Sequence, residues 1–142
     1  YQIFESTAMG ADAVLLIVRI LDPQRLANLI QLATSLRLAA LVEIYTEADI
    51  ETAARAGAQM VGINNRNLTS FETDLGRTLK LLPLLQPAQV AVAASGIRSR
   101  RDIRHYQAHG VFNFLIGESL VRSENPAGFL KMLQGEKEHV GQ

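Results

Sequence analysis

Five short apolar runs recur along the chain at intervals of roughly 20 to 30 residues, which is the spacing of repeated strand–helix units. The runs are mostly continuous rather than alternating in polarity, as in strands that are covered on both faces. This pattern favours a parallel sheet in the α/β class. The five expected strands are residues 13–18, 41–45, 59–63, 89–93 and 111–116.

Capping residues mark the helix starts between these strands. Asp22 followed by Pro23 gives an N-cap and a proline at the first helical position, which predicts a helix over residues 24–36. Apolar residues recur there at helical spacing, so one face of this helix is expected to be buried. Residues 1–9 read as the end of an earlier helix. Three further starts are predicted at Thr46 with Asp49, Ser99 with Asp102, and Asn125 with Pro126.

The expected order is a helix followed by five strand–helix units, which we interpret as a single domain over residues 1–142. Two parallel architectures fit this order. A flavodoxin-like open sheet accommodates five strands, whereas a (β/α)8 barrel needs three more and typically has about 250 residues.

The composition narrows the classes of function. The chain is 48% hydrophobic and 20% charged, and its formal net charge is zero. This balance is typical of a soluble globular protein and gives no electrostatic reason to bind nucleic acid or a membrane surface. The lack of cysteine is compatible with a cytoplasmic location, and no apolar run has the ~20 residues that span a bilayer. The histidines lack metal-ligand spacing, so no metal site is expected.

Ligands of parallel sheets collect at the carboxyl ends of the strands, so polar residues there are the first candidates for a site. Glu43 lies inside the otherwise apolar second run, where an ionised carboxylate is unfavourable unless it is paired or functional. We expect Glu43 to take part in proton transfer. The alternative is a structural ion pair with a neighbouring arginine or lysine.

Four polar residues follow the third run without interruption. Among them, Asn64 is expected to hydrogen-bond a ligand, and Arg66 to bind a carboxylate or to orient Glu43. The alternative is that Asn65, Arg66 and Asn67 cap backbone groups in a turn, and at least one of them is expected to do so.

The fourth and fifth runs end in Ser95-Gly96 and Gly117-Glu118. Small residues let backbone N–H groups approach an anion, which favours a phosphate between these two strand ends. A cluster of arginines around the next helix start is interpreted as a solvated face, with phosphate steering as the lesser alternative. This cluster is Arg98, Arg100, Arg101 and Arg104.

The octet VGINNRNL at residues 61–68 resembles the end of the sixth barrel strand of indole-3-glycerol phosphate synthase. Four other segments are similar to the same family, in the same order and at similar spacing: residues 10–18, 41–43, 95–97 and 115–120. The resemblance implies a partial (β/α)8 barrel of the phosphate-binding, ribulose-phosphate type, running here from the third helix through the eighth strand and helix. It also implies an activity in tryptophan biosynthesis. This is the decarboxylating and dehydrating ring closure of 1-(2-carboxyphenylamino)-1-deoxyribulose 5-phosphate, without a cofactor.

The resemblance further implies a role for each matched residue. Glu43 would be the general base during dehydration, Asn64 would contact the substrate near its reacting hydroxyls, and Arg66 would lie in the polar network around Glu43. Leu16 and Leu68 would form an apolar wall against the anthranilate ring. The phosphate would be held by Ser95, Gly96, Gly117 and Glu118, largely through backbone N–H groups.

The chain departs from the family pattern at several positions. Ala94 stands where the family usually has glutamate, and Tyr45 where it often has histidine. The family's general-acid lysine and the other charged groups of its first three strands are not located in this chain. We therefore expect that the chain alone does not turn over substrate. Two alternatives remain: a non-catalytic module that binds phosphate ligands or serves in an interaction, and a different phosphate-binding barrel enzyme such as an isomerase.

A five-stranded parallel sheet leaves the outer edges of its first and last strands without a neighbour, and such edges tend to find partners. We expect self-association through residues 13–18 or 111–116, or pairing with an N-terminal barrel half.

Overall fold

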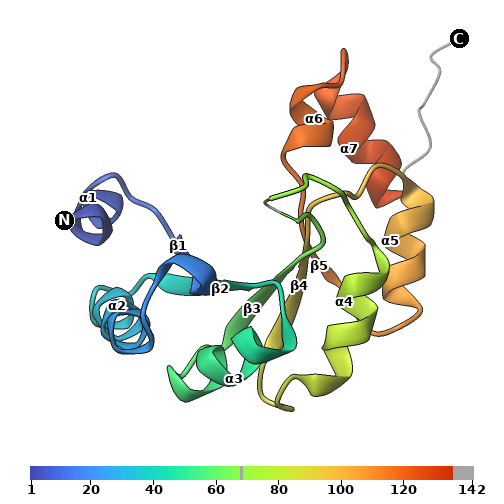
Figure 1. Ribbon diagram of the computed structural model, residues 1–142. Coiled ribbons are helices and arrows are strands. Elements are labelled where there is room, and N and C mark those ends of the chain that lie inside the picture. Colours follow the sequence, from blue (N-terminus) through green and yellow to red (C-terminus); the bar gives the residue numbers. More distant parts are fainter. Residues whose placement is uncertain (68, 136–142) are drawn as a thin grey trace, which may run out of the picture.

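The computed structural model describes residues 1–67 and 69–135, and these residues form one parallel sheet in which the strand order follows the chain order (Figure 1). Each strand pairs with its neighbours in sequence, as repeated strand–helix–strand units do. The strands are β1 (Ala13–Ile17), β2 (Ala39–Ile44), β3 (Met60–Asn64), β4 (Val90–Ala94) and β5 (Asn113–Leu115).

The register of the sheet decides which side chains share a face. Glu43 of β2 is paired with Ile17 of β1 and with Gly62 of β3. Further along, Asn64 is paired with Ala94. Because paired residues of neighbouring strands point to the same face and every second residue of a strand does so too, Glu43, Asn64 and Ala94 lie on one face of the sheet.

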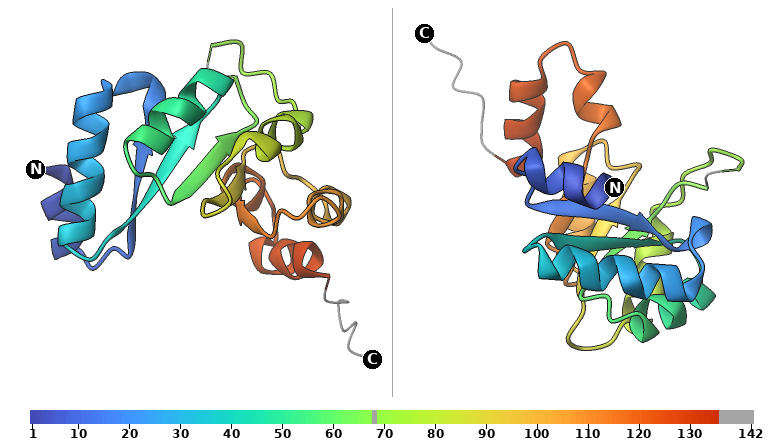
Figure 2. Two further views of the ribbon diagram at one scale, coloured as in Figure 1. Left: turned by 90° about the horizontal axis from the view of Figure 1, so that it is seen from below. Right: turned by 90° about the vertical axis from the view of Figure 1, so that its left-hand side faces the viewer.

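Helices cover the other face of the sheet (Figure 1). The main covering helices are α2 (Pro23–Ser35), α3 (Glu47–Arg55), α4 (Gly76–Leu81) and α5 (Arg100–Gln107). The remaining helical segments are α1 (Gln2–Ala8), η1 (Val18–Ile20), η2 (Leu82–Leu84), α6 (Glu118–Val121) and α7 (Pro126–Gln134). From a second direction, α1 and α7 lie at opposite ends of the sheet (Figure 2).

The expected capping residues begin the helices. Asp22 accepts a hydrogen bond from the backbone N–H of Arg25, and Asn125 accepts one from Gly128. The boxes of Thr46 with Asp49 and of Ser99 with Asp102 are both complete. Each such cap satisfies N–H groups that the first helical turn leaves unpaired, which contributes about 1 kcal/mol.

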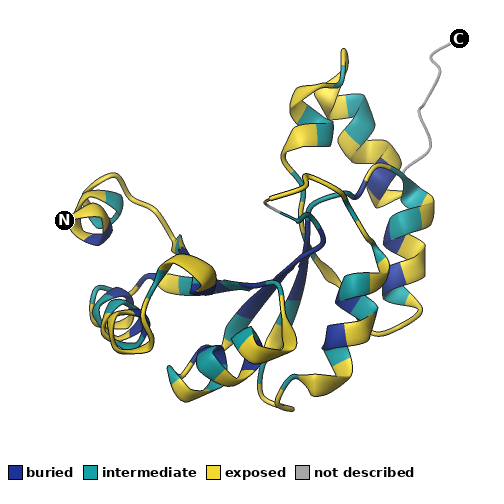
Figure 3. Ribbon diagram, in the orientation of Figure 1, coloured by how far each residue is buried: buried dark blue, intermediate teal, exposed yellow. Residues whose placement is uncertain are grey.

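The core lies between the sheet and the helices, where the buried residues of Figure 3 gather on β3, β4 and the inner helix faces. Its larger cluster joins Val42 and Val61 of the sheet to Leu26 of α2 and Ile50 of α3. A second cluster joins Ala93 of β4 to residues of α5 and α7. Each half of the sheet therefore packs against a different set of helices.

The sequence prediction of five parallel strands is confirmed, with strand ends that differ by one or two residues. The short helix α6 was not expected from the sequence. Within the sheet, β1 and β5 are the edge strands. Among the described residues, no helix is both long enough and apolar enough to cross a membrane.

Candidate functional site

Glu43 and Asn64 meet at the carboxyl ends of β2 and β3. The side-chain amide of Asn64 donates a hydrogen bond of 3.1 Å to Oε1 of Glu43. Asn64 is buried, whereas Glu43 is only partly so and lines an open cavity. The Glu43 carboxylate is thus oriented by an amide rather than by the arginine or lysine of the alternative interpretation.

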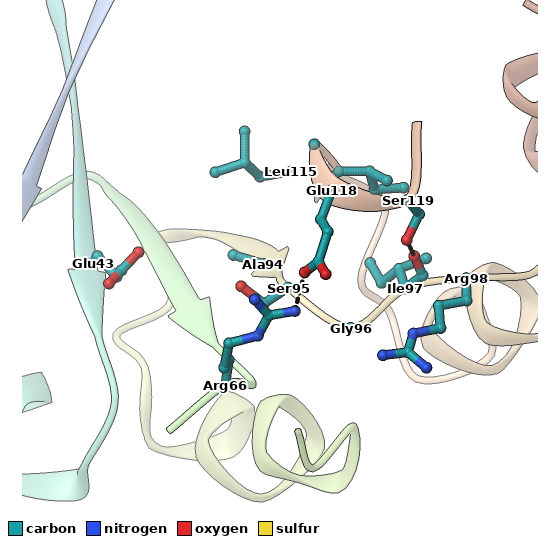
Figure 4. Close-up of a pocket in the computed structure, with 12 residues that line it drawn as sticks. Glu43, Arg66, Ala94, Ser95, Gly96, Ile97, Arg98, Leu115, Glu118 and Ser119 are labelled. Carbon is teal, nitrogen blue, oxygen red and sulfur yellow. Dashed lines mark hydrogen bonds and ion pairs between the residues drawn. The ribbon is translucent and has the colours of Figure 1, made fainter. Parts of the chain in front are cut away.

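Arg66 follows β3 and connects the same Asn64 to the far side of the cavity. Its backbone N–H donates a hydrogen bond of 2.9 Å to Oδ1 of Asn64. Its guanidinium forms an ion pair with Glu118 at the start of α6 (Figure 4). The expectation that the Arg66 side chain orients Glu43 is therefore wrong, because the guanidinium points to Glu118 and the connection to Glu43 runs through Asn64.

The Arg66–Glu118 pair shapes the electrostatics of the cavity. The hydrogen bond from Arg66 lowers the pKa of the Glu118 carboxyl, although partial desolvation opposes this. Arg122, the residue after α6, also contacts Glu118, at 3.1 Å. Nε of Arg66 is buried and has no hydrogen-bond partner among residues 1–67 and 69–135.

Two glycine turns form the other wall. Ser95 and Gly96 follow β4 with φ values of +67° and +81°, a left-handed conformation that glycine adopts easily and serine does not. The turn lies close to the loop after β3, since a Cβ at Gly96 would be 2.2 Å from Cγ2 of Thr73. Ser119, next to the second turn, donates a hydrogen bond of 2.8 Å to the carbonyl of Ile97, which fixes one turn against the other.

These elements enclose a cavity of about 350 Å³ at the carboxyl edge of the sheet (Figure 4). Glu43 lies on one side, and the two glycine turns with Glu118 lie on the other. The cavity thus brings together most of the residues that the sequence singled out. Those that line it are Glu43, Arg66, Ser95, Gly96, Gly117 and Glu118, joined by Ala94, Ile97, Arg98, Leu115, Ile116 and Ser119.

Arg98 is a lining residue that the sequence interpretation assigned to a solvated face. It lies two residues after Gly96, and its positive charge contributes to the lowered pKa of Glu118. This short distance in sequence from the glycine turn distinguishes Arg98 from the other arginines of the cluster and could have identified it as a lining residue. Arg100, for comparison, donates a hydrogen bond to the carbonyl of Leu133 and so joins α5 to α7.

The prediction that Leu16 lines the site is wrong. Leu16 is paired with Val42, and both pack against α2 and α3 on the face opposite Glu43. The neighbouring positions Leu15 and Ile17 of β1 have the orientation of Glu43 instead. The other residue expected in the apolar wall, Leu68, lies outside the described residues.

The chain matches the family model described as indole-3-glycerol phosphate synthase over residues 1–133. An indole-3-glycerol phosphate synthase of Desulfosudis oleivorans is 56% identical over 133 residues, which are 94% of this chain and 51% of that protein. One of Syntrophobacter fumaroxidans is 47% identical over 135 residues, 95% of this chain and 51% of that protein. The chain therefore spans about half the length of these curated relatives.

Among solved structures, 3-hexulose-6-phosphate synthase from Salmonella typhimurium has a similar fold. The TM-score is 0.76 at 19% sequence identity, and the match covers 93% of this chain and 65% of that one. The likeness supports the fold alone. The predicted partial (β/α)8 barrel is confirmed.

Proposed function

Because the chain belongs to the indole-3-glycerol phosphate synthase family, we propose that its cavity takes part in the family's ring closure. The substrate would be 1-(2-carboxyphenylamino)-1-deoxyribulose 5-phosphate, which loses carbon dioxide and water as the indole ring forms. The carrying observation is that Glu43, which accepts a hydrogen bond from Asn64, lines the same cavity as the two glycine turns.

Glu43 would act as the general base of the dehydration step. Its Oε1 accepts a hydrogen bond from the Asn64 amide, which holds the carboxylate in one orientation, and Oε2 would take a proton from the substrate. The proton and a substrate hydroxyl would then leave as water. Asn64 would hold the reacting end of the substrate through the same amide group.

The phosphate would lie on the opposite side, between the two glycine turns. Backbone N–H groups at Ser95-Gly96 and Gly117 can approach an anion closely because Gly96 and Gly117 carry no side chain. Arg98 adds a positive charge to the same wall. This spacing would place the phosphate across the cavity from Glu43, as a substrate with a phosphate at one end and a reacting carbon chain at the other requires.

A general acid for ring closure would have to come from another segment. The lysines of the chain are Lys80, Lys131 and Lys137. Lys80 and Lys131 lie on α4 and α7, away from the residues that line the cavity, and Lys137 lies outside the described residues. We therefore propose that the 142-residue chain has the base and the phosphate site but does not turn over substrate by itself.

An assay of indole-3-glycerol phosphate formation tests this function. The chain is measured alone and after mixing with the N-terminal part of the Desulfosudis oleivorans relative. That relative's own two parts serve as the positive control. We expect no product from the chain alone and product after complementation. No product from the complemented chain, while the control pair is active, would overturn the catalytic proposal.

The second candidate is a module that binds phosphate ligands without turnover, and Ala94 favours it. Ala94 lines the cavity at the position where the family usually has glutamate, so the cavity lacks one carboxylate beside Asn64. Ala94→Glu is therefore assayed beside the unmodified chain, each mixed with the same N-terminal part. Phosphate binding without product from the complemented unmodified chain would favour the module, and product from that chain would exclude it.

A further inference from the structure

Asn65 lies between two site residues but points away from the cavity. Asn64 and Arg66 contact Glu43 and Glu118 on the cavity side. The Asn65 side chain is fully buried on the helix-covered side, between β4, α4 and α5. The proposed mechanism assigns no role to this buried amide.

Both ends of the Asn65 amide are hydrogen-bonded. Its Nδ2 lies 3.0 Å from the carbonyl oxygen of Ala94, 3.1 Å from that of Ser95 and 2.9 Å from Oη of Tyr106. Its Oδ1 accepts from the backbone N–H and from Oγ1 of Thr78, at 3.2 and 2.9 Å. The orientation of the amide is fixed, because a flipped amide would turn its oxygen toward two carbonyls.

Tyr106 of α5 also holds the Asn65 amide in its orientation. Its hydroxyl accepts from Asn65 and donates a hydrogen bond of 2.9 Å to the carbonyl of Leu75. Burial raises the pKa of this phenol, so it stays protonated and continues to donate. Thr78 and Tyr106 are themselves fully buried, which excludes water as a competing partner.

The carbonyl that Asn65 holds belongs to a strained residue. Ser95 has a φ of +67°, and a residue with a Cβ occupies this region at a cost of roughly 1–2 kcal/mol. Such a conformation persists only where its surroundings impose it. The Asn65 amide binds the carbonyls on both sides of the Ser95 Cα, those of Ala94 and Ser95, and therefore constrains the rotation that would relax the turn.

We propose that Asn65 is a positioning residue for phosphate: it holds Ser95 and Gly96 in the left-handed turn that presents their backbone N–H groups to the cavity, while Thr78 and Tyr106 orient its amide. This inference rests on the proposed function, since it takes the turn to be the phosphate site. A buried amide with a purely structural role would stabilise the chain without selectively affecting phosphate affinity.

The test compares Asn65→Asp with Ile50→Val in the ¹⁵N-labelled 142-residue chain. Asn65→Asp keeps the oxygen that faces Thr78 but removes the donor to the two carbonyls. Ile50→Val removes one buried methylene in the α3 core, far from the turn. Binding of inorganic phosphate and the amide hydrogen exchange of Gly96 and Ile97 are measured by NMR, at a temperature where each variant is folded.

We expect Asn65→Asp to bind phosphate at least about tenfold more weakly and to exchange the Gly96 amide faster, whereas Ile50→Val changes neither. Adding Ser95→Gly to Asn65→Asp should recover part of the lost affinity, because glycine adopts positive φ without strain. If Asn65→Asp does not fold, Asn65→Ala removes the contacts to both carbonyls, together with the contact to Thr78, without introducing a carboxylate.

The role of Asn65 is overturned if a folded Asn65 variant retains the phosphate affinity and the Gly96 exchange rate of the unmodified chain. Failure of the unmodified chain to bind phosphate has a different meaning. It would count against the proposed phosphate site, while the exchange rates would still decide whether Asn65 holds the turn.

Discussion

The amide of Asn64 donates to the carboxylate of Glu43 across the pairing of β3 with β2, at 3.1 Å. The two residues are 21 positions apart in sequence, and the parallel register alone brings them together. The second atom of the amide, Oδ1, is already occupied by the backbone N–H of Arg66. Neither end of Asn64 is thus free to rotate, and Glu43 is directed into the cavity before any ligand binds.

Replacing Glu43 by glutamine tests the assignment of the base. Glu43→Gln removes the proton acceptor while keeping size and hydrogen-bonding capacity, so the rate constant kcat of the complemented enzyme should fall by about 10²–10⁴-fold. Phosphate affinity should not change, because the glycine turns lie across the cavity. The control is Glu47→Gln at the exposed start of α3. Unchanged kcat in Glu43→Gln would show that another group is the base.

The ion pair between Arg66 and Glu118 predicts a dependence of stability on pH. Arg66 lowers the pKa of the Glu118 carboxyl from its ordinary value of 4.5. The unfolded chain therefore binds this proton more readily than the folded chain. The stabilisation is complete above pH 4.5 and is lost as the pH falls through the lowered folded-state value.

Urea unfolding of Glu118→Gln measures this contribution. We expect the variant to lose less unfolding free energy than the unmodified chain when the pH is lowered from 7 to 3, since the carboxyl that titrates is gone. Glu124→Gln, an exposed position six residues further on, is the matched control. Parallel pH profiles for the unmodified chain and Glu118→Gln would contradict the prediction.

Sequence patterns located the strands and most of the site, because each of these signals is local. The capping residues act within one helical turn, and Glu43 is conspicuous as a charge within an apolar strand. The sequence does not predict which face of the sheet the Leu16 side chain occupies. In a strand that is apolar on both faces, no alternation of polar and apolar residues distinguishes the two faces. Leu15 and Leu16 therefore look equivalent in sequence, although the first is half exposed and the second is buried.

Local sequence patterns also do not predict the hydrogen-bond partners of the polar residues at the end of β3. Asn64, Asn65 and Asn67 are chemically identical, yet one bonds Glu43, one is buried against α4 and α5, and one caps a turn at Thr69. What separates them is the direction of each side chain at the strand end and contacts with elements 10 or more residues away. The expectation that at least one would cap backbone groups is confirmed.

Among the glycines of residues 1–67 and 69–135, Gly96 should be the least tolerant of a side chain. Gly57 has almost the same φ, +82° against +81°, but a Cβ there meets nothing within 4 Å. Gly57→Ala should therefore lose only the strain of positive φ, roughly 1–2 kcal/mol. Gly96→Ala should lose a further 1–3 kcal/mol or so, because its Cβ overlaps Thr73.

Thr73→Ser identifies the source of this difference. It removes the methyl group that lies 2.2 Å from a Cβ at Gly96. The double variant should therefore recover most of the extra loss in a urea unfolding experiment, and no such recovery is expected when Thr73→Ser is combined with Gly57→Ala. Equal losses for Gly96→Ala and Gly57→Ala would show that the loop after β3 yields to the new side chain.

The edges of the sheet lead to the last prediction. We propose that two copies of the chain associate with β5 of one against β1 of the other. Each of these strands has a sheet neighbour on one side only in the part of the chain that the structure describes, and all strands run in parallel. Leu15 and Leu115 each leave nearly half of their surface exposed at these edges. A sheet continued from one copy to the next would bury both of them and would satisfy the edge backbone groups.

Sedimentation velocity measures this association over a range of concentrations. Leu15→Lys and Leu115→Lys should each weaken it, because a lysine at either edge opposes strand addition. The control is Ile20→Lys, which places the same charge at an exposed position in η1 outside the sheet. An N-terminal barrel half added in trans should compete with the second copy, since it would occupy the same edges. A monomer at every concentration, or equal effects of all three lysines, would rule out pairing through β1 and β5.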